Sequence, residues 1–276
     1  MSRASTPDAL RPDALLASAL AAARRAAAVI ERHATAEARA RLEWREKGAT
    51  DFVTMVDTAA ERAIAECLLD EHPDATLVGE ELSPGALDAA LASPLAFVAD
   101  PLDGTTNFLH GFPWYAVSVA ALAWGEIVAG AVLNVATGET FTATAGGGAC
   151  RDGRPIRVSA IDEPSRALVG TGFPFKYERD LERYQPQFAE VARRTAGMRR
   201  PGSAALDLCD VACGRFDAFW ELSLQPWDVA AGILLVREAG GVVTDARGRP
   251  SRVAAAPLVA GNPAMHAWLL AIVRET

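Results

Sequence analysis

The chain is poor in the features that mark secreted, membrane-spanning and nucleic-acid-binding proteins. It has 4 cysteines in 276 residues, too few and too scattered for a framework of extracellular disulfides. No apolar run approaches the roughly 18 residues that a transmembrane helix needs, and residues 1–45 contain no signal-peptide core. The 27 basic residues, of which two are lysine, are outnumbered by 35 acidic ones, so binding to nucleic acid or anionic lipid is not favoured. We therefore expect a cytoplasmic protein that does not associate with membranes.

Half of the residues are apolar, which is typical of a globular protein with a sizeable core. Helical spacing predicts one long helix or two over 13–45, and further helices over 58–69 (capped by Asp57 or Thr58), 203–212 and 229–238. Short apolar runs predict strands at 75–78, 95–99, 115–124, 126–134, 141–144 and 242–244. This order predicts a layered α/β or α+β sandwich. We expect a single domain, 1–276, of two packed halves, roughly 1–145 and 146–276, with the boundary at Gly146–Gly148.

Residues 100–108, Asp-Pro-Leu-Asp-Gly-Thr-Thr-Asn-Phe, combine the features of a metal site and a phosphate site. They follow an apolar strand and open a short helix, and the proline stiffens the turn so that Asp100 and Asp103 point to one side. Gly104 allows close approach of the backbone to a ligand, and the next two amides lie at a helix N-terminus, where anions bind. Each carboxylate would repel a phosphate by roughly 4 kcal/mol at about 4 Å and an effective dielectric near 20. Divalent cations between the acids and the phosphate would remove this repulsion.

Other acidic residues suit the same site. Glu80 and Glu81 follow a predicted strand, Asp228 stands where a helix begins, and Asp51 and Asp57 bracket a short apolar segment. A ligand set of oxygens without His or Cys suits Mg²⁺ or Mn²⁺ and argues against zinc. Each of these acids also fits an ordinary turn, a helix cap or a solvated loop. From the residues alone the pattern indicates a magnesium–phosphate site and leaves these alternatives open.

Four segments resemble the signatures of the inositol monophosphatase family, a group of Mg²⁺-dependent, lithium-sensitive phosphomonoesterases. They are 100–108, Trp-Asp-Val-Ala-Ala-Gly at 227–232 with Glu-Ala-Gly-Gly at 238–241, Asp-Phe-Val-Thr-Met-Val-Asp at 51–57, and Gly-Glu-Glu at 79–81. They occur in the family's order, and the resemblance runs from about Lys47 to the C-terminus. It implies an αβαβα sandwich, a homodimer, and hydrolysis of a phosphate monoester by direct attack of water, without a covalent enzyme intermediate.

The resemblance also implies a role for each matching residue. The ligands of two or three Mg²⁺ ions, for which Mn²⁺ could substitute, would be Glu80, Asp100, the carbonyl of Leu102, Asp103 and Asp228. Glu80 and Thr105 would orient the attacking water, with Asp57 behind the metals. The amides of Gly104 and Thr105 would hold the phosphate, and the hydroxyls of the substrate would contact Asp103, Ala204, Glu221 and Asp228. Lys47 is similar to a basic residue near the mouth of the site.

The choice of substrate is carried by the family pattern. Other branches often have lysine where this chain has Thr106, so Thr106-Asn107 favours inositol 1-phosphate. The alternatives with the same chemistry are histidinol phosphate, fructose 1,6-bisphosphate, a nucleotide 3′-phosphate and glycerol 2-phosphate. An alternative of another class is a binding role in a transcription or RNA complex. The pI of about 5.1 weighs against that as the sole role.

Overall fold

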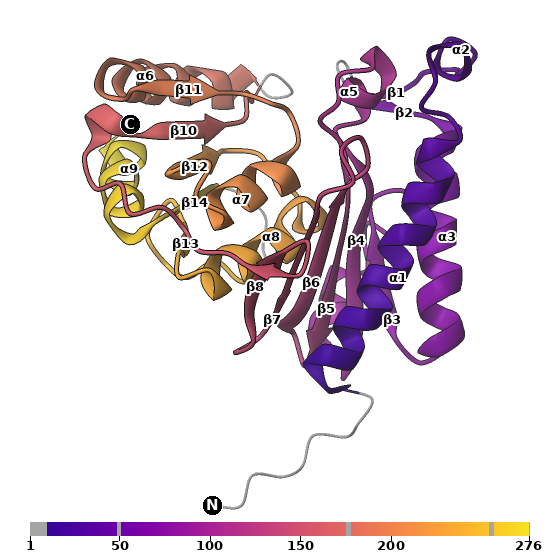
Figure 1. Ribbon diagram of the computed structural model, residues 1–276. Helices are drawn as coiled ribbons and strands as arrows, with labels where there is room; N and C mark the ends of the chain where they lie inside the picture. The colour runs from indigo at the N-terminus through magenta and orange to yellow at the C-terminus, as the bar shows by residue number, and fades with distance from the viewer. Residues whose placement is uncertain (1–9, 49–50, 175–177, 254–256, 276) are drawn as a thin grey trace, which may run out of the picture.

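A computed structural model describes residues 10–48, 51–174, 178–253 and 257–275. Two large β-sheets and three layers of helices alternate through the molecule, and β1 (Arg45–Gly48) and β2 (Asp51–Val53) form a separate two-stranded sheet (Figure 1). The order of layers is α, β, α, β, α, which confirms the predicted sandwich. Within the described ranges, no helix combines the length and apolar character needed to cross a bilayer.

The first sheet has the strand order β3-β4-β5-β6-β7-β8-β9, with β3 parallel to β4 and every other pair antiparallel. Its strands are Thr76–Gly79, Leu95–Asp103, Ala116–Ala123, Glu126–Asn134, Thr140–Thr144, Gly148–Arg151 and Arg154–Pro155. β4 and β5 are buried along nearly their whole length because helices cover both faces of the sheet. On the outer face α1 (Pro12–Glu31) packs against α3 (Met55–Glu71) and the sheet, and its buried alanines let it lie close.

The second sheet has the order β11-β10-β12-β14-β13. In chain order its strands are Leu168–Thr171, Gly197–Arg199, Ala218–Glu221, Val242–Asp245 and Leu258–Gly261. Its outer helices are α6 (Glu178–Arg194) and α9 (Pro263–Glu275), while α7 (Ala204–Ala212) and α8 (Pro226–Glu238) lie between the two sheets. The smaller elements are α2 (Ala36–Arg39), β1 (Arg45–Gly48), β2 (Asp51–Val53), α4 (Leu87–Ala92), α5 (Thr105–His110) and a 3₁₀ turn at Pro164–Arg166.

Most of the predicted elements are present, with corrections at their ends. The predicted helical region 13–45 forms two helices, α1 and α2, and the hairpin of β5 and β6 is confirmed. Neither Asp57 nor Thr58 caps α3: Thr54 is the cap, because its hydroxyl accepts a hydrogen bond from the amide of Val56 while Asp57 accepts one from the amide of Thr54. α8 begins at Pro226 rather than at Val229, since proline is well suited to the first helical position.

The glycines at 146–148 do not lie where the chain passes from one sheet to the other. They form the turn between β7 and β8, with positive φ at Gly146 and Gly148 and both amides bound to the carboxylate of Glu238 at 2.9 Å. The chain leaves the first sheet at Pro155 and enters the second at Leu168. The boundary between the sheets is therefore C-terminal to the predicted one, and the description as a single domain stays a prediction.

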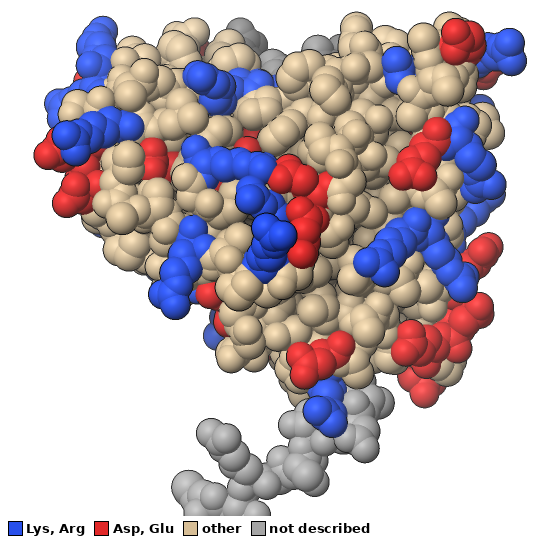
Figure 2. All heavy atoms as spheres, viewed as in Figure 1, with Lys and Arg blue, Asp and Glu red and all other residues tan. Residues whose placement is uncertain are grey.

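Charged side chains of both signs are interspersed on the face of the molecule in Figure 2. No broad area of one sign covers the described residues on that face. Six acidic residues line a cleft between the two halves: Glu80, Asp100, Asp103, Asp207, Glu221 and Asp228.

Candidate functional site

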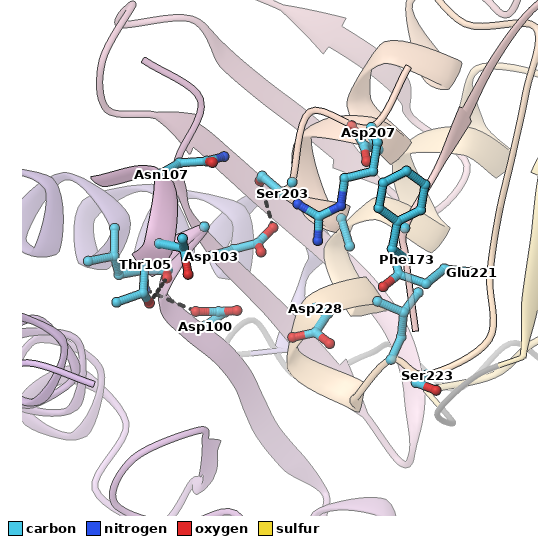
Figure 3. A pocket seen from close by; sticks show the side chains of 18 of the residues that line it. Asp100, Asp103, Thr105, Asn107, Phe173, Ser203, Asp207, Glu221, Ser223 and Asp228 are labelled. Atoms are coloured by element: carbon cyan, nitrogen blue, oxygen red, sulfur yellow. Dashed lines mark hydrogen bonds between the residues drawn. The ribbon is translucent and has the colours of Figure 1, made fainter. Parts of the chain in front are cut away.

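A cleft of about 200 Å³ is lined by residues from both halves of the chain (Figure 3). From the first half it receives Glu80, after β3, and the segment from Asp100 to Asn107. From the second half it receives Gly172 to Pro174, the N-terminal ends of α7 and α8, and the end of β12. Strand ends and helix N-termini meet here, which is the usual location of ligands in layered α/β proteins. The size of the cleft favours a small molecule.

The end of β4 is irregular, and this irregularity aims its acids at the cleft. The pairing with β5 shifts register between Asp100 and Asp103, and the amide of Leu102 donates to Asp100 Oδ1 at 2.9 Å. Gly104 then has φ of 92°, and a Cβ there would lie 2.9 Å from the carbonyl oxygen of Trp114. A glycine is required at this position both for its conformation and for the space.

Asp57 lies behind the loop and holds Thr105. The hydroxyl of Thr105 lies 2.9 Å from Asp57 Oδ1 and 3.0 Å from the carbonyl oxygen of Leu102, so its one proton can serve either acceptor. The other oxygen of Asp57 accepts hydrogen bonds from the amide and the hydroxyl of Thr54, at 2.9 and 2.7 Å. Burial raises the pKa of Asp57, although the bonds from Thr54 and Thr105 oppose that rise.

Asp103 and Asp228 connect the cleft to the two central helices. Asp103 Oδ2 accepts hydrogen bonds from the hydroxyl of Ser203 at 2.7 Å and from the amide of Ala205 at 2.8 Å, which joins the end of β4 to the start of α7. Asp228 occupies the third position of α8, where its Oδ2 accepts from the amide of Gln225 at 2.7 Å. Asp228 is therefore a capping residue, and it also borders the cleft.

The carboxyl groups of the cleft raise one another's pKa values. Burial, followed by the charges of Glu80, Asp103 and Asp228, raises the pKa of Asp100 well above its usual value. Burial and the charges of Asp103 and Glu80 do the same for Asp228. Burial raises the pKa of Asp103 to about 6 against two hydrogen bonds that lower it. Because these acids lie close enough to repel one another, a cation between them would stabilise their charged forms.

The donor set fits a hard cation, although the side chains are not arranged around one point. Among the described residues, no three His, Cys, Asp or Glu side chains form a group that could hold a metal ion as they stand. One oxygen each of Asp103 and Asp228 is already bound to protein donors. The oxygens are nevertheless of the type that Mg²⁺ prefers, and their mutual repulsion is what a divalent ion would relieve.

The opposite wall contains the residues expected to contact substrate hydroxyls. Ala204 is the first residue of α7, and Glu221 ends β12. The carboxylate of Glu221 packs directly on Gly172, where a Cβ would lie 2.0 Å from its Cδ. Figure 3 shows Glu221, Phe173 and Ser223 on the side of the cleft away from Asp100. Phe173 and Ser223 were not predicted from the sequence, because nothing in their neighbours distinguishes them from ordinary loop residues.

Asp207 is a further residue of the cleft that sequence reasoning missed. It is 1% exposed, and its Oδ1 has no hydrogen-bond partner. Burial, followed by the charges of Glu221 and Asp103, raises its pKa well above the usual value. The signal that could have found it is its position inside the apolar segment 204–212. Burying a carboxyl group there costs free energy unless its oxygens are hydrogen-bonded, so such a residue suggests a specific role.

Three other predicted residues remain to be placed. Asn107 donates through Nδ2 to the carbonyl oxygens of Trp114 at 2.7 Å and Pro201 at 2.9 Å, so it joins the two halves beside the cleft. The side chains of Lys47 and Asp51 lie outside the described residues, although their backbones belong to β1 and β2.

The chain is similar to known proteins over most of its length. A family model described as "Inositol monophosphatase family" matches residues 11–276. The chain is 46% identical over 216 residues to the inositol-1-monophosphatase of Rhizobium meliloti, covering 78% of this chain and 80% of that one. It is 44% identical over 232 residues to the Nus factor SuhB of Pseudomonas aeruginosa, covering 83% and 85%. The crystal structure of the extragenic suppressor protein suhB from Bartonella henselae superimposes with a TM-score of 0.87 at 38% identity, covering 95% and 99%.

Proposed function

Because this chain belongs to the inositol monophosphatase family, and is therefore a phosphatase, we propose that it hydrolyses inositol 1-phosphate in a Mg²⁺-dependent reaction. The observation that carries the proposal is the meeting of Asp100, Asp103 and Asp228 at one cleft, where each has a raised pKa. Such a set of acids beside a helix N-terminus suits a phosphate ester only when cations lie between them.

The residues that would hold the metal are Glu80, Asp100, the carbonyl of Leu102, Asp103 and Asp228. When bound, Mg²⁺ lowers the pKa of a coordinated water and neutralises charge on the phosphoryl group and the leaving oxygen. Two or three ions per site and the use of Mn²⁺ in their place are part of this proposal. Glu80 and Asp100 lie on the side of the first sheet, and Asp228 comes from α8, so the ligands span both halves of the chain.

The chain's own groups would orient the water and the ester. When Thr105 donates its proton to Asp57, its hydroxyl oxygen can accept a hydrogen bond from the attacking water, while Glu80 orients the same water from the other loop. The amides of Gly104 and Thr105 would bind the phosphate oxygens. No covalent bond to the protein forms in this scheme.

The alcohol part of the ester would face the wall formed by Ala204 and Glu221, with Asp103 and Asp228 nearby. A carboxylate accepts hydrogen bonds from adjacent hydroxyl groups, which suits a polyol. Histidinol phosphate, fructose 1,6-bisphosphate, a nucleotide 3′-phosphate and glycerol 2-phosphate are the alternative substrates. Inhibition by lithium, a homodimer and a cytoplasmic location also belong to the proposal.

A comparison of substrates tests it. We expect purified protein with Mg²⁺ to show a higher kcat/KM for inositol 1-phosphate than for the four alternatives, and no turnover when Mg²⁺ is removed. Asp100→Asn and Asp228→Asn should each lose most of the activity while the fold, checked by circular dichroism, survives. A clear preference for another ester would overturn the substrate assignment, and near-native turnover of either variant at low Mg²⁺ would overturn the ligand assignment.

The similarity to proteins named Nus factor SuhB supports a second candidate, a binding role in a transcription complex. The net charge of −8 weighs against direct binding to nucleic acid and leaves protein partners open. Capture of transcription proteins by the inactive Asp100→Asn variant would support this second role, whereas robust turnover without such capture would count against it.

A further inference from the structure

Helix α3 carries two buried carboxyl groups one turn apart. Asp57 and Glu61 are four residues apart, so both side chains project from the same face of the helix. They are 2% and 0% exposed. Asp57 contacts the Thr105 loop, as described above, whereas Glu61 belongs to none of the motifs and has been given no role in the site.

Glu61 binds the chain immediately after the predicted metal ligand Glu80. Its Oε2 accepts a hydrogen bond from the amide of Glu81 at 2.6 Å, and its Oε1 accepts one from the amide of Leu82 at 2.9 Å. These two hydrogen bonds use both oxygens of the carboxyl group. One side chain of α3 therefore fixes two successive peptide groups of the loop.

Glu61 also contacts the residue before Glu80. A Cβ at Gly79 would lie 2.0 Å from Glu61 Oε1 and 2.5 Å from its Cδ, so the carboxyl group occupies space that only glycine leaves open. The amide of Gly79 donates to the hydroxyl of Ser83 at 3.1 Å, which closes the turn. Gly79 is required here for space, because its φ does not lie in the left-handed region.

Glu80 is consequently fixed on both sides by one carboxyl group. Its preceding residue packs against Glu61, and its following residue donates to Glu61. The flanking backbone of Glu80 can therefore not rotate or shift without breaking a contact with α3. Since α3 also holds Thr105 through Asp57, one helix sets the positions of two loops that approach the cleft from different places in the sequence.

We propose that Glu61 is a positioning residue that fixes the backbone of Glu80 for metal binding, so that α3 aligns the Glu80 loop with the Thr105 loop. This inference rests on the proposed function, in which Glu80 is a ligand of Mg²⁺. Glu61 itself would not contact metal or substrate, because its carboxylate is directed to the amides of Glu81 and Leu82.

The first test is Glu61→Gln, with Mg²⁺ binding measured by titration calorimetry on the whole protein. Glutamine has the size of glutamate, but its NH₂ group cannot accept a hydrogen bond, so one loop amide loses its acceptor. Changes in groups that orient metal ligands typically weaken metal affinity about 10–100-fold, and we expect a loss in that range. The Mg²⁺ concentration for half-maximal activity should rise by the same factor, with kcat largely recovered at saturating Mg²⁺. Glu66→Gln, at an exposed position of the same helix, is the matched control and should change nothing.

A second variant disturbs the contact between Glu61 and Gly79 by a change in the loop. Gly79→Ala places a methyl group where the Glu61 carboxylate lies, so it should weaken Mg²⁺ binding in the same way as Glu61→Gln. The double variant should lose less Mg²⁺-binding free energy than the sum of the losses in the two single variants, since both changes break the same interaction.

A measurement on the unaltered protein does not depend on either variant folding. If Glu80 binds metal and Glu61 fixes its loop, Mg²⁺ should slow hydrogen exchange at the amides of Glu81 and Leu82 severalfold. Metal binding and the hydrogen bonds of these amides to Glu61 would then stabilise each other. Unchanged exchange at both amides on saturation with Mg²⁺ would overturn the inference.

The remaining outcomes separate this inference from the proposed function. A folded Glu61→Gln protein with unchanged Mg²⁺ affinity refutes the positioning role, and a lower melting temperature with unchanged affinity shows a purely structural residue. If the unaltered protein binds Mg²⁺ but does not hydrolyse inositol 1-phosphate, the substrate assignment fails while the binding and exchange measurements still test Glu61. If the unaltered protein binds no Mg²⁺, the metal site itself is wrong, and both proposals fall.

Discussion

At the scale of single residues, Asp207 places an ionisable side chain in surroundings that disfavour charge. Its carboxyl group is buried in α7 with one oxygen lacking a donor, and Glu221 and Asp103 add negative charge nearby. Burial, followed by these charges, favours the neutral form of the carboxyl group and raises its pKa. Asp207 should therefore make the folded protein less stable at high pH than it would be with a neutral residue.

Asp207→Asn tests this expectation. An unfolded aspartate has a pKa near 3.9, and burial raises the pKa of folded Asp207 well above that, so the group's contribution to stability falls as pH rises between the two values. Asparagine does not titrate. With EDTA present, the free energy of unfolding of the variant minus that of the wild type should be larger at pH 8 than at pH 4, measured by urea denaturation. The exposed Asp74→Asn is the control; an equal difference at both pH values would contradict the account.

Glu221→Gln examines the wall that faces the alcohol. Glutamine fits the space beside Gly172, but it lacks the charge with which Glu221 would accept hydrogen bonds from two hydroxyls. Hydrogen bonds to charged groups contribute about 1.5–3 kcal/mol, so kcat/KM for inositol 1-phosphate should fall about 10–100-fold. The kcat/KM for the smaller glycerol 2-phosphate should fall much less. Equal losses for both esters would mean that Glu221 does not contact the polyol.

The residues that could be predicted from the sequence are those at the ends of strands and helices. Asp100, Asp103 and Asp228 stand next to recognisable turns, and all three border the cleft. Glu61 and Asp207 lie inside helices, where a charged residue usually faces water. Periodicity could not separate Glu61 from surface positions, because only the tertiary structure shows that its face of α3 is covered. For Asp207 the apolar neighbours in 204–212 were a signal that the sequence analysis did not use.

At the scale of elements, the N-terminus of α3 combines helix capping with the support of Thr105. Thr54→Ala removes the side-chain acceptor for Val56 and one of the two donors to the second oxygen of Asp57. The loss of a helix cap lowers the free energy of unfolding by about 0.5–2 kcal/mol. Because the buried carboxylate of Asp57 also loses a donor, we expect a loss of about 2 kcal/mol. Urea denaturation measures this change, and kcat should fall as Asp57 loses its orientation. Thr54→Ser keeps the hydroxyl, so it should retain both the stability and the kcat of the wild type. If Thr54→Ala keeps full stability, Thr54 does not cap α3.

The two sheets differ in how well they could be predicted. In the first sheet the sequence analysis located β3 to β7, of which β4 and β5 are apolar runs buried on both faces, but it missed the short and more exposed β8 and β9. In the second sheet only β13 was predicted. β10, β12 and β14 have four residues each, too few to show a period, and α6 is highly charged with Pro186 in its interior. The αβαβα order therefore came from the family resemblance and not from local patterns.

At the scale of the whole molecule, the mutually repelling acids lie where the two halves meet, so metal binding should stabilise the entire fold. A ligand at 100 times its dissociation constant adds about 2.7 kcal/mol, which for a chain of this size raises the melting temperature by about 5 °C. We expect this rise when Mg²⁺ is added after EDTA treatment, measured by calorimetry. Asp100→Asn should show little of it. A similar rise in that variant, or with NaCl at equal ionic strength, would indicate a non-specific effect of salt.

The close packing of α7 on α8 predicts how the protein behaves when its chain is cut into two fragments. A Cβ at Gly232 would lie 2.5 Å from Leu208, so the two helices that carry Ser203 and Asp228 cannot separate without losing that contact. Both helices come from the C-terminal part of the chain, yet α8 packs on the strands of the N-terminal part. Two separately expressed fragments, cut between Pro155 and Leu168, should each be inert, and turnover should return only when the fragments reassociate.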